Sequence, residues 1–77
     1  MDIAEEILKN EMYKKVIDKL SSETLRVIAD DHNRALKEAK KGIDLAEPEK
    51  VNDLRHLKVV ANGMQELARS LLEKRKQ

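Results

Sequence analysis

The residues of this sequence that could do chemistry are two histidines and a few carboxylates. His56 follows Asp53 by three positions, so an imidazole and a carboxylate share one helical turn, a spacing that forms half of the metal site in some helical bundles. Such a site also needs paired glutamates on facing helices, and none is evident. We therefore interpret the two residues as a solvated surface pair. Asp30 and Asp31 lie on the polar side of a predicted helix and are also expected to be solvated.

His32 falls at the centre of the apolar face of a predicted helix, where we expect it to lie opposite Ala61. Three roles are compatible with that position. A polar residue in a buried seam can fix helix register or oligomeric state, which is our leading interpretation. A histidine that gains a proton at about pH 6 could instead loosen the packing. Metal binding is the third role, although the chain has no cysteine and only one other histidine to complete a site.

Known catalytic motifs are missing from the sequence. It contains no G-x-S-x-G, no glycine-rich phosphate loop, no H-E-x-x-H and no nucleophile next to a plausible base. We predict that the protein is not an enzyme and uses no cofactor and no metal.

The composition is typical of long helices and coiled coils, since 40% of the 77 residues are charged and another 40% are hydrophobic. A chain of this length forms one domain at most, residues 1–77, and buries only about 60% of the surface that it exposes when unfolded. Because there is no cysteine for a disulfide, we expect a homo-oligomer or a larger protein assembly to supply stability.

The charge pattern limits the expected partners. Sixteen basic and fifteen acidic residues are interspersed, which predicts no extended basic surface and makes nucleic acid the less favoured partner. No apolar run reaches the roughly 18 residues of a membrane span. The acidic start also lacks the basic region of a signal peptide. We expect no membrane partner and a cytoplasmic location.

Apolar residues recur at intervals of three and four along the chain, which predicts an all-α fold. We expect helices at about residues 2–20, 22–41 and 48–74. The second and third form an antiparallel, coiled-coil-like hairpin that is preceded by the first helix and oligomerises into a helical bundle.

Capping and stop signals set these boundaries. Asp2 is a plausible N-cap of the first helix, and the pair Ser21 and Ser22 offers one for the second, although the backbone could also run on. Gly42 follows two lysines and is expected to stop the second helix. Pro48 fits the first turn of the third helix, where its missing N–H costs nothing.

Two heptad seams join the predicted hairpin. Antiparallel pairing places Ala39 beside Leu54, and nearly every layer then sets a large residue against a small one. The alternative is that the two apolar faces pack on unrelated partners. The expected interface residues are Leu25, Ile28, His32, Ala35 and Ala39 on the second helix, and Leu54, Leu57, Ala61, Met64, Ala68 and Leu71 on the third. Other apolar residues flank both seams, so the first helix or a second hairpin should cover them.

A second contact surface is suggested by the first helix and by the back of the third. Ile3, Ile7 and Leu8 lie on a different side of the first helix from its later apolar residues, so we expect the first ten residues to reach a neighbouring chain. Val59 and Gly63 belong to a small, uncharged strip on the third helix. A glycine inside a helix costs about 1 kcal/mol relative to alanine, and close approach of another helix would explain it.

The segments AEPEKVNDLRHLK at 46–58 and MQELARSLL at 64–72 resemble the second arm of small helical-hairpin proteins from tailed-phage structural genes. The likeness covers about residues 22–74. It implies a virion or assembly component that packs against larger shell, portal or tail proteins. The outline is also similar to plasmid-type hairpin dimers that bind RNA, although no motif residues carry across. We therefore expect a structural or assembly protein acting through helix packing, with a nucleic-acid-binding regulator built on a hairpin dimer as the alternative.

Overall fold

The structure is a computed structural model that describes residues 3–76, with every side chain in that range except that of Ala4. The expected N-cap Asp2 lies outside the described residues. The described residues form five α-helices and one short 3-10 helix, namely α1 (Ile3–Lys9), α2 (Glu11–Asp18), α3 (Ser22–Asp30), α4 (His32–Ala46), η1 (Pro48–Lys50) and α5 (Leu54–Arg75). Residues 3–76 contain no strand, so the prediction of an all-α fold is confirmed.

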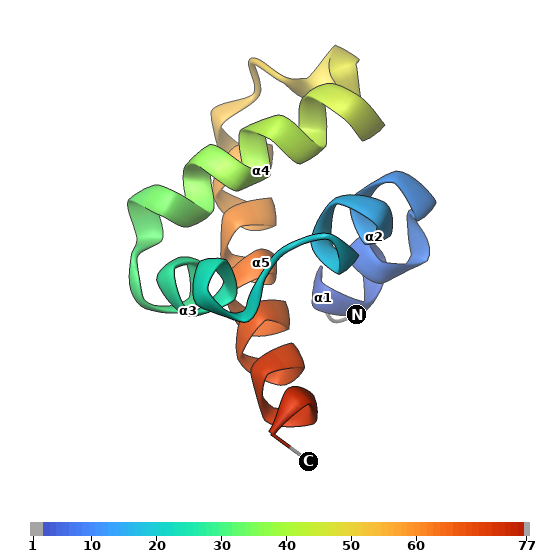
Figure 1. Cartoon of the computed structure of the whole chain (residues 1–77). Helices are drawn as coiled ribbons and strands as arrows, with labels where there is room; N and C mark the ends of the chain where they lie inside the picture. The colour runs from blue at the N-terminus through green and yellow to red at the C-terminus, as the bar shows by residue number, and fades with distance from the viewer. Residues whose placement is uncertain (1–2, 77) are drawn as a thin grey trace.

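The longest helix, α5, is the one around which the others pack. Helices α1, α3 and α4 all contact α5, while α2 contacts α4 and η1 folds back against the end of α4. Figure 1 shows α3 on one side of α5, α1 and α2 on the other, and α4 crossing its upper half. The core lies between these helices and consists of Ile7, Tyr13, Ile17, Leu25, Ile28, Ala29, Ala35, Ala39, Ile43, Val60, Ala61, Met64, Leu67 and Ala68.

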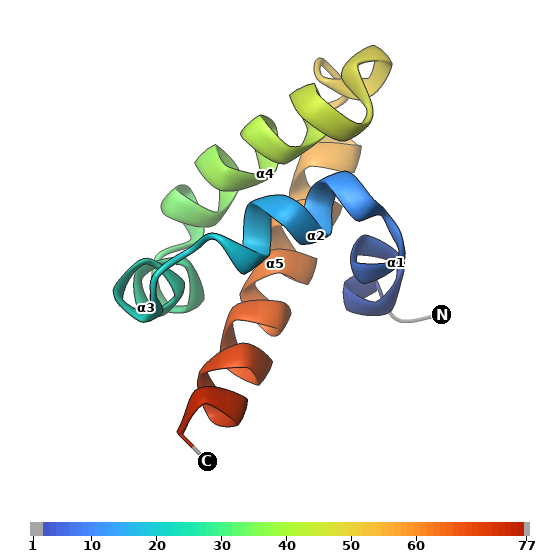
Figure 2. The same ribbon diagram turned by 45° about the vertical axis from the view of Figure 1, so that its right-hand side comes forward.

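The first predicted helix, at residues 2–20, is two helices that break at Asn10. The Asn10 side chain accepts hydrogen bonds from the backbone N–H groups of Met12 (3.0 Å) and Tyr13 (3.4 Å) and so caps α2. An asparagine that bonds to the backbone in this way competes with continuation of the helix. The break turns α1 and α2 in different directions, as Figure 2 shows.

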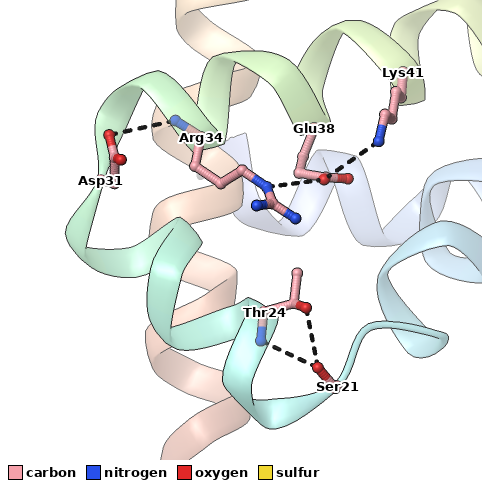
Figure 3. Close-up of polar contacts among 6 residues, drawn as sticks. All are labelled: Ser21, Thr24, Asp31, Arg34, Glu38 and Lys41. Atoms are coloured by element: carbon pink, nitrogen blue, oxygen red, sulfur yellow. Dashed lines mark hydrogen bonds and ion pairs between the residues drawn. The ribbon is translucent and has the colours of Figure 1, made fainter.

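The second predicted helix, at residues 22–41, is also broken, at Asp31. Its start is as predicted, because the hydroxyl of Ser21 accepts from the backbone N–H of Thr24 (3.1 Å) and caps α3. Asp31 then caps α4 by accepting from the backbone N–H groups of Asn33 (3.0 Å) and Arg34 (3.4 Å), a contact drawn in Figure 3. The prediction that Asp31 is simply solvated was therefore incomplete, because its carboxylate also caps the start of a new helix.

The break at Asp31 leaves carbonyl groups at the end of α3 without partners in their own helix. Helix α5 supplies those partners. The amide of Gln65 donates to the carbonyl oxygens of Ile28 (3.1 Å) and Ala29 (3.4 Å), and the guanidinium of Arg69 donates to that of Ala29 (3.1 Å). The end of α3 is thus capped by side chains about 40 residues further along the chain.

Gly42 does not stop a helix, and that prediction was wrong. Helix α4 continues to Ala46, and Gly42 is buried within it. A Cβ atom at this position would lie 2.8 Å from Cε1 of Tyr13 and 3.1 Å from Cε of Met64. The glycine is required because the aromatic ring lies against the backbone of α4, not because the helix ends there.

The third predicted helix also begins later than expected. Pro48 occupies the first position of the 3-10 helix η1, and α5 starts only at Leu54, with Asp53 as its N-cap. Asp53 accepts from the backbone N–H groups of Arg55 (3.1 Å) and His56 (3.2 Å). The Asp53 carboxylate, which the sequence spacing pairs with the His56 ring, is thus hydrogen-bonded to the backbone.

We expect Ala39→Leu to destabilise the fold by about 1–3 kcal/mol, because Ala39 is 0% exposed and a larger side chain must displace its neighbours. Chemical denaturation monitored by circular dichroism measures this cost. Lys40→Leu, at the exposed neighbouring position, is the matched control and should change stability little. Equal denaturation midpoints for the two variants would show that the packing around Ala39 is not as described.

Candidate functional site

The most concentrated polar cluster in the described residues surrounds the carboxylate of Glu47, which follows α4. The hydroxyl of Tyr13 donates to Glu47 Oε2 (2.9 Å), and Nε2 of His56 lies 2.7 Å from the same oxygen. The ammonium of Lys50 is 3.5 Å from Oε1. The cluster thereby links α2, the end of α4, η1 and the first turn of α5.

Each member of this Glu47 cluster is positioned by a local feature of the chain. The ring of Tyr13 lies against the backbone of Gly42, which directs its hydroxyl toward the end of α4. The N-cap Asp53 fixes the first turn of α5 and with it His56. These constraints hold three donors around one carboxylate.

The pKa values of the cluster follow from these contacts. Burial by itself raises the pKa of Glu47, but hydrogen bonds with His56 and Tyr13, together with the charges of His56 and Lys50, outweigh it and lower the pKa below its ordinary value. Burial and the hydrogen bond to Glu47 raise the pKa of Tyr13 well above its ordinary value. Glu47 is therefore the ionised acceptor and the Tyr13 phenol the donor.

A cavity of about 210 Å³ lies beside the Glu47 cluster. Besides the four cluster residues it is lined by Ile3, Glu6, Ile7, Asn10, Val59 and Val60. Sites for small molecules usually enclose about 300–1,000 Å³. Residues 3–76 also hold no group of three or more acidic, histidine or cysteine side chains that could bind a metal ion. The arrangement fits a polar contact that holds helices together better than it fits a binding pocket.

The interpretation of Asp53 and His56 as a solvated surface pair was wrong for His56, whereas Asp53 is exposed. His56 keeps only 22% of its side-chain surface exposed and pairs with Glu47. The sequence carried one usable signal, namely Tyr13, because a buried tyrosine hydroxyl needs a hydrogen-bond partner. Its partner is 34 residues away, and no local pattern identifies it.

The predicted seam residues fall into three groups. Leu25, Ile28, Ala35, Ala39, Ala61, Met64 and Ala68 are buried, and Leu57 and Leu71 are partly buried against the core. His32 and Leu54, in contrast, are exposed, and Leu54 keeps 70% of its surface in contact with solvent. The expected layer of Ala39 against a buried Leu54 is therefore wrong. The buried seam residues pack inside one chain.

His32 does not lie in a buried seam. It begins α4 at the surface, where its Nδ1 atom is 3.1 Å from Oε1 of Gln65. Because Asp31 starts a new helix, the heptad count that placed His32 on the apolar face does not continue across the break. The polar contact of His32 to α5 is made with Gln65, the residue that also caps the end of α3.

The expected second contact is partly present, but within the chain. A Cβ atom at Gly63 would lie 2.6 Å from Cγ2 of Ile3 and 2.6 Å from Cδ1 of Ile7, so α1 approaches α5 at this glycine. The expectation that these residues reach a neighbouring chain is wrong for Ile3 and Ile7. Leu8 and Val59 remain 40% and 41% exposed.

Glu38 is a buried carboxylate that sequence reasoning missed. It is 4% exposed and lies on the side of α4 that also carries the buried Ala35 and Gly42. Its Oε1 atom is 3.2 Å from Nε of Arg34 and 3.7 Å from Nζ of Lys41, as drawn in Figure 3. A buried charge needs such partners, and here both come from the same helix.

A shallow hollow on the outer face of α4 is the second surface feature of interest. It encloses about 480 Å³ and is lined by Lys37, Lys40, Lys41, Asp44 and Val51. We call it the lysine hollow. Lys41, on one side of the hollow, also forms an ion pair with the buried carboxylate of Glu38.

Large apolar side chains also remain exposed on the folded chain. They are Leu8, Met12, Val27, Leu45, Leu54 and Val59. Leu45 (56%) and Leu54 (70%) are the most exposed of them. Both lie at the end of the molecule where α4 ends and α5 begins (Figure 1), which we call the turn end.

Comparison of the chain with known family models, with curated proteins and with solved structures finds no match. Among the described residues, no helix has the length and apolar character needed to cross a membrane.

The lowered pKa of Glu47 predicts a pH dependence of stability. A carboxylate whose pKa is lower in the folded state stabilises the fold above its unfolded pKa, and that stabilisation is lost as the pH falls through the folded value. Glu47→Gln should cost about 1–2 kcal/mol near pH 7 and flatten the decline in unfolding free energy below about pH 5. Urea denaturation at a series of pH values measures both effects.

Glu49→Gln is the control for this experiment, because Glu49 is exposed and lies in η1, the short helix that Glu47 precedes. It should retain the wild-type pH profile. If Glu47→Gln kept the wild-type dependence of unfolding free energy on pH, the Glu47 cluster would not be a contact that stabilises the fold.

Proposed function

We propose that this chain is a structural or assembly protein that acts through helix packing, as a homo-oligomer or as part of a larger protein assembly. The observation that carries the proposal is the turn end, where Leu45 and Leu54 are 56% and 70% exposed. Val51 lies between them in sequence and is also partly exposed. Two largely exposed leucines on either side of one short connection between helices are a candidate protein contact surface.

The energies are compatible with reversible association. Full burial of an exposed leucine side chain contributes about 1.5–3 kcal/mol, so the parts of the two leucines that are still exposed, 56% and 70%, together supply about 2–4 kcal/mol. Association costs at least about 4 kcal/mol in lost translational and rotational freedom. The turn end therefore requires additional contacts from the surrounding surface, and association is expected to depend on protein concentration.

The remaining polar features support this proposal because they serve the fold. The Glu47 carboxylate is engaged by Tyr13, His56 and Lys50. Its role in the proposal is to hold the turn end rigid. The likeness to tailed-phage hairpin proteins adds a kind of partner, namely a larger shell, portal or tail protein, and with it a place in the virion or in the cytoplasm during assembly.

We expect Leu45→Gln/Leu54→Gln to weaken self-association at least tenfold without lowering the melting temperature, because both side chains are solvated in the single chain. Sedimentation velocity over a hundredfold range of concentration measures the association. Val27→Gln, at an apolar residue on α3 that is 40% exposed, is the matched control and should associate as the wild type does. A wild-type chain that stays monomeric at every concentration would contradict the homo-oligomer.

Nucleic-acid binding is the second candidate, and the lysine hollow is the observation that favours it. Lys37, Lys40 and Lys41 gather there on one face of α4. Each phosphate neutralised on duplex DNA steepens the logarithmic salt dependence of binding by about 0.9. If this function holds, a labelled duplex should bind with a salt slope of about −2 to −3, and Lys37→Gln/Lys40→Gln should reduce the slope. Absence of binding to both a DNA duplex and an RNA hairpin at low salt would remove this candidate.

A further inference from the structure

We infer that the lysine hollow is a docking site for the N-terminal elbow of a second copy of this chain, so that copies associate head to tail. The elbow is the bend between α1 and α2, and its exposed residues are Glu5, Glu6, Leu8, Lys9, Glu11 and Met12, of which Glu6 also lines the cavity beside the Glu47 cluster. This inference rests on the proposed assembly function and adds to the turn end a second pair of contacting surfaces.

The elbow presents apolar side chains among acids. The inner face of α1 is used by Ile3 and Ile7, which pack against Gly63 of α5. Leu8 and Met12 remain 40% and 41% exposed. Residues 5–12 carry three glutamates and one lysine, which leaves a net charge of −2.

The lysine hollow has the opposite pattern. Three lysines and one aspartate line it, which leaves a net charge of +2, and Val51 adds an apolar side chain. The aliphatic stems of the lysines provide further apolar surface beneath their charged ends. A leucine or methionine can therefore enter the hollow while glutamates meet the lysines around it.

The two surfaces are opposite in charge, since three lysines and one aspartate line the hollow while the elbow carries three glutamates and one lysine, although Lys41 also pairs with Glu38. Lys9 of the elbow offers Asp44 of the hollow a cationic partner. A phosphate backbone has no cation to offer Asp44. Stacking on bases is also not available there, because Tyr13 is the only aromatic residue of the chain and is 3% exposed. The hollow therefore fits the elbow better than it fits nucleic acid.

Helix α1 and the end of α4 lie apart in the folded chain. In Figure 2, α1 lies at the side of the molecule, whereas the end of α4 and η1 lie at its top. Contact between two different surfaces is heterologous, and it produces a ring if the rotation closes and a filament if it does not. Either product is suited to an assembly protein.

A charge exchange tests the inference. Lys37→Glu/Lys40→Glu reverses the hollow, and Glu5→Lys/Glu11→Lys reverses the elbow. Each variant alone should associate at least tenfold more weakly than the wild type, because its two surfaces then carry charge of the same sign. An equimolar mixture should recover association to within about threefold of the wild type, since each variant again finds a complementary surface in the other. Sedimentation velocity at low and moderate salt measures all three samples, and recovery should weaken as salt is added.

The controls separate this inference from the proposed function. Lys58→Glu/Lys74→Glu makes the same charge change at exposed positions of α5 and should associate as the wild type does. Circular dichroism checks that each variant is folded. Glu5 and Glu11 lie in the first turns of their helices, where acids are favoured. If their reversal unfolds the chain, Leu8→Gln/Met12→Gln replaces it and should weaken association in the same way.

Three results would overturn the inference. Variants that associate as tightly as the wild type would place the contact elsewhere and leave the assembly function intact. A mixture that does not recover association would show that the two surfaces do not meet each other. The third result is a wild type that is monomeric and binds a labelled DNA duplex, while Lys37→Glu/Lys40→Glu does not bind it. That result would assign the hollow to nucleic acid, and the homo-oligomer would fail with it.

Discussion

Tyr13 makes the contact on which the arrangement of the helices depends. Its ring lies so close to the backbone of α4 that Gly42 can carry no side chain, and its hydroxyl donates to Glu47, where His56 and Lys50 also meet. One side chain therefore ties the N-terminal helices to the end of α4 and the start of α5. Because the hydroxyl is satisfied by an ionised carboxylate, burying it costs little. The same contact explains why a glycine lies in the middle of a helix.

Two short polar side chains have an equally large effect on the shape. Asn10 and Asp31 each accept backbone hydrogen bonds that start a new helix, so that two long predicted helices become four shorter ones. Long straight helices would leave much of the apolar surface of this chain uncovered. The breaks let α1, α3 and α4 each lie against α5, and Gln65 and Arg69 then cap the end of α3. The chain covers its flanking apolar residues without a second copy.

The surface that remains after this packing is what supports an assembly function. Most seam residues of the predicted hairpin lie in the core of one chain, whereas Leu45, Leu54, Leu8 and Met12 stay exposed. Lysines gather on α4 and glutamates near the N-terminus. Contacts between copies are therefore expected to combine apolar side chains with complementary charge, which makes association reversible and dependent on salt.

The sequence by itself determined the helical fold, the cap at Ser21 and most of the buried positions, because these depend on spacing and on contacts within a few residues. It also contained the breaks at Asn10 and Asp31, but capping and helix continuation compete there, and only packing shows which prevails. The tertiary structure decided which side chains meet. Tyr13 finds Glu47 across 34 residues, and Gly63 receives α1, because those contacts depend on the angles between helices. The spacing of apolar residues along a single helix does not specify the angles between helices.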